Sequence, residues 1–357
     1  MEWLFRSEFD ALTRIALWSI AAVLVTTVVL FVYTMGLRFA TVAGNRRRRR
    51  FLSSWRDVFV TAALDKHAAV NLALPRRGRH DHSDLLEEWN RARSVVAGSA
   101  ADNLIVLGRR IGIPELAAKL LGRRRIASRV LAVQTFGHLR DESRFDELAA
   151  LLDNANTALS VTAANSLVEM DPAAGINLVV PLINRRRDWP KTKVSSLLLE
   201  AGSDCISEPL YRAIRSADDD DKAYLLTFAR LIESEARDAL VEDLIRETQH
   251  PGVLTAALNL VSGLRGTPRI AALTRHDAWF VRMQAAAALG RIGQQEHLAL
   301  LESLLSDPEW WVRYRAARSI TSLPFLGPNQ LRRLQRRQED PYAVDILQQT
   351  MAEVGLA

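Results

Sequence analysis

The sequence predicts an all-α protein, an α-solenoid of stacked helix pairs preceded by one N-terminal transmembrane helix. Two observations carry this expectation: an uncharged stretch of 21 residues near the N-terminus, and a pattern of about 30 residues that recurs towards the C-terminus. The composition agrees, because 48% apolar residues exclude a disordered chain and 7% aromatics with few Gly and Pro favour helix over sheet. A chain of 357 residues is long for one globular core, so several domains or a repeat array is expected.

The uncharged stretch runs from Ile15 to Met35, with Trp18 and Tyr33 near its two ends. As a helix it would be about 31 Å long, close to the roughly 30 Å thickness of the hydrocarbon core. Trp and Tyr favour the headgroup level. We therefore expect a transmembrane helix over residues 15–37. An uncleaved anchor fits better than a cleaved signal peptide, because the stretch is long and acidic residues precede it.

The basic residues near this stretch predict its orientation. Residues 1–50 hold eight Arg and three acidic residues, a net charge of +5 out of the total of +6, which leaves +1 for residues 51–357. Most of these arginines follow the stretch, and the run comprises Arg46, Arg47, Arg48, Arg49 and Arg50. The positive-inside tendency predicts a single-pass protein of the inner (cytoplasmic) membrane, with residues 1–14 as a short extracytoplasmic tail and the C-terminal domain in the cytoplasm. The run either sets topology alone, the simpler interpretation, or also attracts anionic lipid headgroups.

Residues 38–84 are predicted to be a basic juxtamembrane segment and linker. Apolar residues between Phe51 and Ala63 follow helical spacing, so this segment either lies on the membrane surface or packs on the first repeat. The segment from Leu74 to Asp84 contains Pro and Gly and reads as the loop before the main domain, residues 85–357.

The repeat is clearest in "DAWFVRMQAAAALG", from Asp277, and "DPEWWVRYRAARSI", from Asp307. Aligning Val281-Arg282 with Val312-Arg313, an offset of 31, superposes the small pairs of both segments. Looser copies are "RIASRVLAVQTFGHL", "NTALSVTAANSLVEM" and "HPGVLTAALNLVSGLRG". Each unit is predicted to be a helix of about fifteen residues, a turn and a second apolar helix. One such pair cannot cover its own apolar face, so neighbouring pairs must stack into a solenoid.

These units resemble HEAT repeats, especially the short bacterial kind also found in phycobilin lyases. The resemblance covers about residues 85–355 and is specific in the last third of the chain. It implies that the Asp of the motif caps a helix or reaches an Arg of an adjoining repeat, and that the small pair lets helices approach closely. The positions that match this ladder are Asp277, Arg282, Asp307 and Arg313.

Two surface features are candidates for binding a partner. The aromatic residues Trp279, Trp310 and Tyr342 stand two places before the Val column, and Trp311 stands one place before it. They would form either an exposed ridge that grips a protein or, as is more common, contacts between repeats inside the array.

The second feature is a pair of arginine triplets, 62 residues or two periods apart. Their members are Arg123, Arg124 and Arg125, and Arg185, Arg186 and Arg187. We expect both triplets in turns on one edge of the array, with the acidic run Asp218–Asp221 one unit later. This edge would be either a docking surface for an acidic partner or lipid headgroups, or a set of solvated turns.

No catalytic, cofactor or metal site is predicted. The sequence has no Gly-rich phosphate loop, G-x-S-x-G or H-E-x-x-H motif. The His80-Asp81-His82 segment lacks a third ligand at useful spacing. Cys205 is the single cysteine, which excludes an internal disulfide and suits a reducing compartment.

The sequence therefore favours a membrane-tethered scaffold or adaptor, not an enzyme, whose cytoplasmic array binds a protein partner. By analogy, the partner would belong to a membrane glycosyltransferase or polysaccharide-secretion system. The alternatives are an adaptor that senses anionic lipid, and a HEAT-like enzyme of the bilin lyase or DNA glycosylase type. A glycosylase needs a basic groove, whereas residues 51–357 net only +1, so no nucleic-acid or small-molecule partner is expected.

Overall fold

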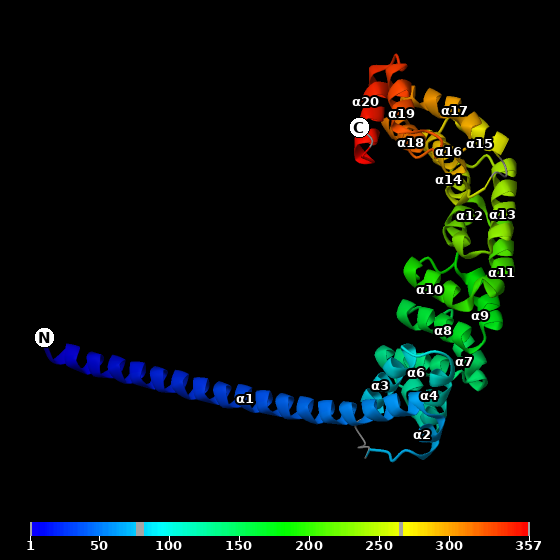
Figure 1. Cartoon of the computed structure of the whole chain (residues 1–357). Coiled ribbons are helices and arrows are strands. Elements are labelled where there is room, and N and C mark those ends of the chain that lie inside the picture. Colours follow the sequence, from blue (N-terminus) through cyan, green and yellow to red (C-terminus); the bar gives the residue numbers. More distant parts are fainter. Residues whose placement is uncertain (1, 76–81, 264–266, 356–357) are drawn as a thin grey trace. The chain divides into compact units, whose positions relative to one another are not determined.

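The computed structural model describes residues 2–75, 82–263 and 267–355, and every regular element in these ranges is a helix. The side chains of residues 2–14, 37 and 39–47 lie outside this description. The chain divides into two compact units, Met1–Leu139 (unit 1) and Arg140–Ala357 (unit 2). Figure 1 shows their helices in chain order.

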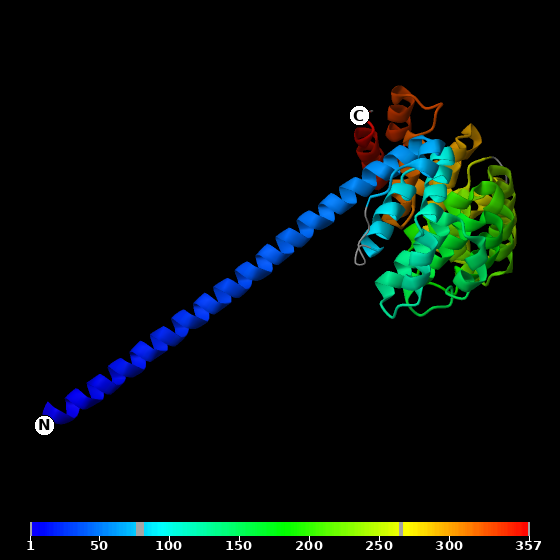
Figure 2. The ribbon, with the colours of Figure 1, turned by 90° about the horizontal axis from the view of Figure 1, so that it is seen from below.

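Unit 1 begins with one exceptionally long helix, α1 (Glu2–Leu64), of 63 residues. Within it, Ile15–Gly36 is long and apolar enough to cross a membrane, and none of this segment is buried. Figure 2 shows this part of α1 as a straight rod that leaves the other helices of its unit. The expected apolar N-terminal helix is therefore present.

The C-terminal part of α1 belongs to the packed unit. Trp55, Val58, Phe59 and Ala62 are buried, and α1 packs against α3 (His82–Ser94) and α4 (Gly98–Arg110). The apolar stripe that begins at Phe51 thus packs on the array instead of standing alone. The expected boundary between residues 84 and 85 falls inside unit 1, because this stripe needs α3 and α4 to cover it.

Ion pairs with α3 hold the same part of α1 in place. Arg56 Nε lies 2.7 Å from Glu88 Oε1, and Arg48 Nη2 lies 2.9 Å from Asp84 Oδ1. The hydrogen bond to Glu88 comes first among the causes that raise the pKa of Arg56 above its ordinary value. Part of the predicted linker is therefore fixed to α3.

The rest of unit 1 consists of α2 (Lys66–Asn71), α5 (Ile113–Leu121) and α6 (Ile126–Leu139). Trp89 on α3 is fully buried and donates from Nε1 to the Leu104 carbonyl at 3.1 Å. A Cβ at Gly108 would lie 3.0 Å from the Trp89 ring, so a side chain at this position would crowd the core of unit 1.

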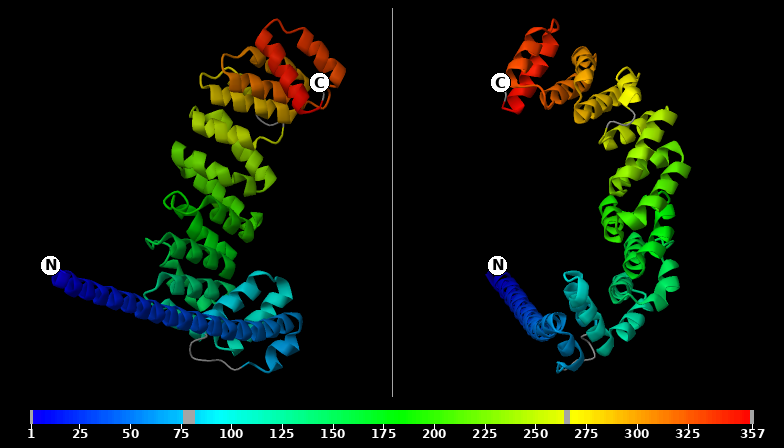
Figure 3. Two further views of the ribbon diagram at one scale, coloured as in Figure 1. Left: turned by 90° about the vertical axis from the view of Figure 1, so that its left-hand side faces the viewer. Right: turned by 45° about the vertical axis from the view of Figure 1, so that its right-hand side comes forward.

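Unit 2 is a row of helix pairs, which Figure 3 shows stacked in chain order. Its α-helices are α7 (Phe145–Ala149), α8 (Thr157–Met170), α9 (Pro172–Val179), α10 (Lys191–Ala201), α11 (Ser203–Ser216), α12 (Asp219–Leu225), α13 (Ser234–Glu247), α14 (Pro251–Leu260), α15 (Thr267–Leu273), α16 (Trp279–Ile292), α17 (Leu298–Ser303), α18 (Trp310–Thr321), α19 (Pro328–Arg336) and α20 (Pro341–Glu353). Short 3₁₀ segments are η1 (Glu142–Arg144), η2 (Val180–Leu182), η3 (Leu226–Leu231), η4 (Gln295–His297) and η5 (Leu304–Ser306).

Alternate helices at the C-terminal end of unit 2 pack in sequence, α14 on α16, α16 on α18 and α18 on α20. Small residues make this possible: Ala285–Ala286 and Ala316–Ala317 are fully buried. A Cβ at Gly290 would come within 2.6 Å of Ser319, whose hydroxyl donates to the Ala286 carbonyl at 2.9 Å. The predicted fold class, an all-α solenoid of helix pairs after one apolar N-terminal helix, is confirmed.

Candidate functional site

The ladder position of the last repeats holds a buried ion pair. Arg282 on α16 donates from Nε and Nη2 to the two carboxylate oxygens of Asp307, at 2.7 and 2.8 Å. The side chains of Arg282 and Asp307 are only 13% and 6% exposed. These hydrogen bonds are the largest cause of the raised pKa of Arg282, and desolvation opposes them. A two-pronged, desolvated pair of this kind fixes α16 against the following repeat.

Asp277 does not occupy the position of Asp307. Arg282 Nη1 donates to the carbonyls of His276 and Asp277, both at 2.9 Å, and Arg313 Nη1 donates to those of Asp307 and Pro308, at 2.7 and 3.0 Å. The equivalent of Asp307 is therefore His276. Its Nδ1 accepts the amide of Ala278, two residues on, at 3.0 Å.

The turns that precede α16 and α18 explain why Asp277 is not equivalent to Asp307. Asp307 Oδ1 likewise accepts the amide two residues on, that of Glu309, at 2.9 Å. The segment "DPEWWVR" has one residue more between Asp and Arg than "DAWFVR". Aligning the two segments on Val-Arg thus places Asp277 one residue too late for the carboxylate role.

The next step of the ladder ends on an aromatic ring. The guanidinium carbon of Arg313 lies 5.5 Å from the centre of the Tyr342 ring, whereas Arg282 meets a carboxylate. Tyr342 follows the N-cap Asp340, whose side chain accepts the Tyr342 amide at 2.9 Å.

The aromatic residues selected from the sequence stand at the starts of α16, α18 and α20, and they are exposed. We call Trp279, Trp310, Trp311 and Tyr342 the aromatic ridge; they are 37%, 41%, 54% and 69% exposed. Their ring–ring contacts stay within one helix: Trp310 stacks on Tyr314 with centroids 5.1 Å apart, and meets Trp311 edge-on at 4.7 Å. The ridge thus has the exposed arrangement, whereas contacts between repeats were the commoner expectation.

The two arginine triplets lie in different units. Arg123, Arg124 and Arg125 are exposed in the turn between α5 and α6 of unit 1. Arg185, Arg186 and Arg187 follow η2 in unit 2. In this second turn the three arginines meet acidic residues, so it is not an uncompensated basic patch.

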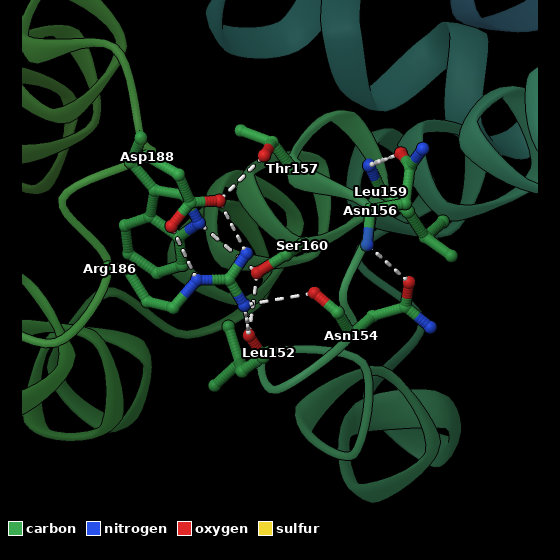
Figure 4. A network of polar contacts seen from close by, with 9 residues as sticks. Leu152, Asn154, Asn156, Thr157, Leu159, Ser160, Arg186 and Asp188 are labelled. Atoms are coloured by element: carbon green, nitrogen blue, oxygen red, sulfur yellow. Dashed lines mark hydrogen bonds and ion pairs between the residues drawn. The ribbon is translucent and has the colours of Figure 1, made fainter.

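Arg186 is the centre of a polar network that joins two repeats (Figure 4). It donates from Nε and Nη2 to the Asp188 carboxylate at 2.9 and 2.8 Å, and from Nη1 to the carbonyls of Leu152 and Asn154. Thr157 donates to the same carboxylate at 2.6 Å. The bonds from Arg186 first, and then that from Thr157, hold the pKa of Asp188 far below its usual range. This arginine therefore serves the packing of the array.

The other members of this triplet are also engaged. Arg187 pairs with Asp221, a member of the acidic run, and lies 3.6 Å from the centre of the Tyr224 ring. Arg185 is 3.9 Å from Asp153. In the arginine run of α1, Arg48 pairs with α3, and Arg49 and Arg50 are exposed. The side chains of Arg46 and Arg47 lie outside the described residues.

Sequence reasoning missed a second group of arginines, at the C-terminal end of α16. Arg230, Arg291, Arg315 and Arg318 line two cavities of about 410 and 660 Å³, and Arg291 lines both. Arg230 and Arg291 are 61 residues apart, close to two repeat periods. That spacing is the signal that would have grouped them.

In the part of the chain that the structure describes, no three His, Cys, Asp or Glu residues gather as a metal site. Of the segment His80-Asp81-His82, only His82 is described, at the start of α3. The described side chains thus form exposed surfaces, cavities and two clamps, the Arg186–Asp188 and Arg282–Asp307 pairs.

The chain is similar in sequence to one family model and, at low identity, to several solved structures. Residues 266–352 match the family model for HEAT repeats. No curated protein matches the chain. Among solved structures, an engineered protein is 16% identical, with a TM-score of 0.35 over 84% of this chain and 94% of that one.

Two natural proteins are also similar at low sequence identity. Kap121p is 11% identical, with a TM-score of 0.47 over 87% of this chain and 46% of that one. Human deoxyhypusine hydroxylase is 15% identical, with a TM-score of 0.20 over 76% and 96%. The match to HEAT repeats thus coincides with the part of the chain that carries the Arg282–Asp307 pair and the aromatic ridge.

Proposed function

We propose that this protein is a membrane-anchored scaffold whose HEAT-like array binds a protein partner through the aromatic ridge. The exposure of Trp and Tyr at the starts of three alternate helices, α16, α18 and α20, is the observation that carries the proposal. Large exposed aromatics rimmed by polar residues mark interaction surfaces, and Trp and Tyr are enriched among the few residues that supply most of the binding energy at protein interfaces.

The ridge stands on a rigid platform. α16 is fixed to the repeat of α18 by the Arg282–Asp307 pair and by the close contact of Gly290 with Ser319, and α18 packs on α20. A partner would therefore meet aromatic side chains that are already in place, which reduces the entropy lost on binding. Trp311 and Tyr342 contribute little to the core, since more than half of each is exposed.

The membrane part of the proposal is supported by α1. Its apolar segment Ile15–Gly36 is followed by the arginines at 38 and 46–50, the pattern expected of a single span with its N-terminus outside and the array in the cytoplasm. We infer that the partner is itself membrane-associated, as the subunits of membrane glycosyltransferases and polysaccharide-secretion systems are.

The test is capture of the partner from membranes that hold the full chain, after cross-linking and detergent extraction. We expect the wild-type chain to retain a defined partner that the double variant Trp311→Ala, Tyr342→Ala loses. The control is Leu199→Ala on α10, which removes another exposed apolar side chain, 64% exposed, away from the ridge. If the ridge variant captures the same proteins as wild type, while folding equally well, the proposal is wrong.

A further inference from the structure

The cavities at the C-terminal end of α16 form an unusual basic surface. We call Arg230, Arg291, Arg315 and Arg318 the arginine groove. The larger cavity is also lined by small residues, Gly290, Gly293, Ser319 and Ser322 among them. The smaller one also receives Arg237, but that residue already pairs with Asp238, at 3.3 Å.

Two members of the groove are held by the end of α14. Arg230 Nη2 donates to the Asn259 carbonyl at 3.0 Å. Arg291 donates from Nε to Val261 and from Nη2 to Leu258, at 3.1 and 2.6 Å. These bonds satisfy carbonyls that a helix leaves open at its C-terminus. Each guanidinium has five N–H donors, so both keep donors for a ligand.

The other two members have no such anchor. Arg315 Nε is buried and makes no hydrogen bond to any residue that the structure describes. Arg318 is exposed, and its guanidinium carbon lies 6.0 Å from the centre of the Tyr314 ring. Within the described ranges, none of the four groove arginines forms an ion pair with a carboxylate.

Two carboxylates on other helices, Asp238 on α13 and Glu353 on α20, are already engaged. Asp238 accepts from Arg237 and from Ser262. Glu353 accepts from Tyr314 at 2.9 Å and from Gln349 at 3.1 Å. Desolvation against α14, followed by the charges of Arg230 and Arg315, lowers the pKa of Arg291 below its ordinary value. The groove thus concentrates positive charge that an anion would balance.

We propose that the arginine groove binds an acidic segment of the protein partner, with carboxylates pairing to Arg315 and Arg318. This inference rests on the proposed function, because it extends the same binding face: Trp311, Arg315 and Arg318 are spaced four and three residues apart along α18 and share one side of it. Arginine matches a carboxylate with two parallel hydrogen bonds.

The dimensions favour a peptide over a nucleic acid. Cavities of 660 and 410 Å³ suit side chains of a single extended chain. Four arginines in a body that nets +1 over residues 51–357 make a local anion site, whereas nucleic-acid affinity grows with the number of phosphates neutralised. Adjacent helices pack about 8–10 Å apart and an extended chain advances about 3.3 Å per residue, so acidic residues at every third position fit the row.

The experiment measures peptide binding to the purified full chain in detergent by fluorescence anisotropy. The probe is a labelled peptide of Ser and Gly with Glu at every third position, compared with the same peptide carrying Gln. We expect the Glu peptide to bind at least about tenfold more tightly than the Gln peptide. The double variant Arg315→Gln, Arg318→Gln should lose that tenfold preference.

The matched control is Arg332→Gln, Arg333→Gln, which removes the same charge from two exposed positions of α19 outside both cavities. It should bind the Glu peptide within about twofold of wild type. Equal binding of the two peptides, or equal loss in the control, would overturn the groove as a specific site. Tighter, groove-dependent binding of a single-stranded oligonucleotide of the same charge would overturn it in favour of a nucleic acid.

The ridge and the groove can fail separately. Loss of Glu-peptide binding in the groove variant supports the groove as a binding site, whatever the ridge variant does. If the ridge variant still captures the partner, that second result refutes only the role of the ridge. Conversely, partner capture that depends on the ridge while the groove variant binds the Glu peptide normally refutes the groove alone. Circular dichroism melting of each variant shows that its fold is intact.

Discussion

The arginines of the clamps and those of the groove have the same chemistry and opposite surroundings. Arg186 and Arg282 each donate two hydrogen bonds to a carboxylate and two more to backbone carbonyls. In the groove, Arg315 and Arg318 have neither kind of partner among the described residues. An arginine whose hydrogen bonds are satisfied within its own array thus stabilises the fold, whereas an arginine without such partners is free to bind a ligand.

The largest effect on stability is expected from breaking the buried Arg282–Asp307 clamp. Asp307→Ala leaves Arg282 desolvated without its carboxylate, so unfolding should become easier by about 3 kcal/mol, the cost of an unpaired buried charge. The urea midpoint of the full chain in detergent measures the change. Asp277→Ala is the control, because that carboxylate is exposed and outside the pair, and it should shift stability by less than about 0.5 kcal/mol. Equal shifts in both variants would contradict the assignment.

A smaller, pH-dependent loss of stability is expected when the Arg186–Asp188 clamp is broken. Asp188→Asn weakens the hold on Arg186 by about 1–2 kcal/mol at neutral pH, the lower part of the range for bonds to charged groups because Asp188 is 42% exposed.

The sign of the pH dependence follows from the lowered pKa of Asp188. Its stabilising contribution is complete above the unfolded pKa of about 3.9 and is lost as pH falls towards the folded value. The difference in urea midpoint between wild type and variant should therefore shrink from pH 5 to pH 2. A difference that stays constant would mean that the carboxylate charge is not what stabilises the clamp.

The smallest effect on stability is expected in the groove. Arg315→Gln, Arg318→Gln breaks no ion pair with a described residue, so its free energy of unfolding should stay within about 0.5 kcal/mol of wild type. The same urea titration checks this. A loss as large as that of Asp307→Ala would show that the groove arginines stabilise the fold as the clamp arginines do.

Much of the fold was predictable because its cause is local. The offset of 31 between Val281-Arg282 and Val312-Arg313, with the small pairs in register, already predicts stacked helix pairs. The apolar stripe from Phe51 to Ala63 predicts a helix as well. Its burial partners were not predictable, because they are α3 and α4, which come later in the chain.

The site was predictable only in part. The sequence selects Trp279, Trp310 and Tyr342 but not their exposure, which depends on how far each helix start projects from its neighbours. The role of Asp277 was misplaced, since one extra residue in a turn shifts a carboxylate without disturbing the helix register. The groove was missed because its arginines come from separate repeats and carry no local motif. The lack of carboxylates near them is also set by the three-dimensional fold and cannot be read from the order of residues.

Because α1 is one continuous helix, the number of its residues determines how its two ends are rotated and spaced relative to each other. Between Gly36 and Arg48 the backbone stays helical, with no hinge to absorb a change. A single inserted residue would turn the apolar span about 100° relative to the packed helices of unit 1 and lengthen α1 by about 1.5 Å. For a chain anchored as proposed, the length of α1 therefore sets two quantities. These are the rotation of the packed helices of unit 1 about the axis of α1 and their distance from the bilayer.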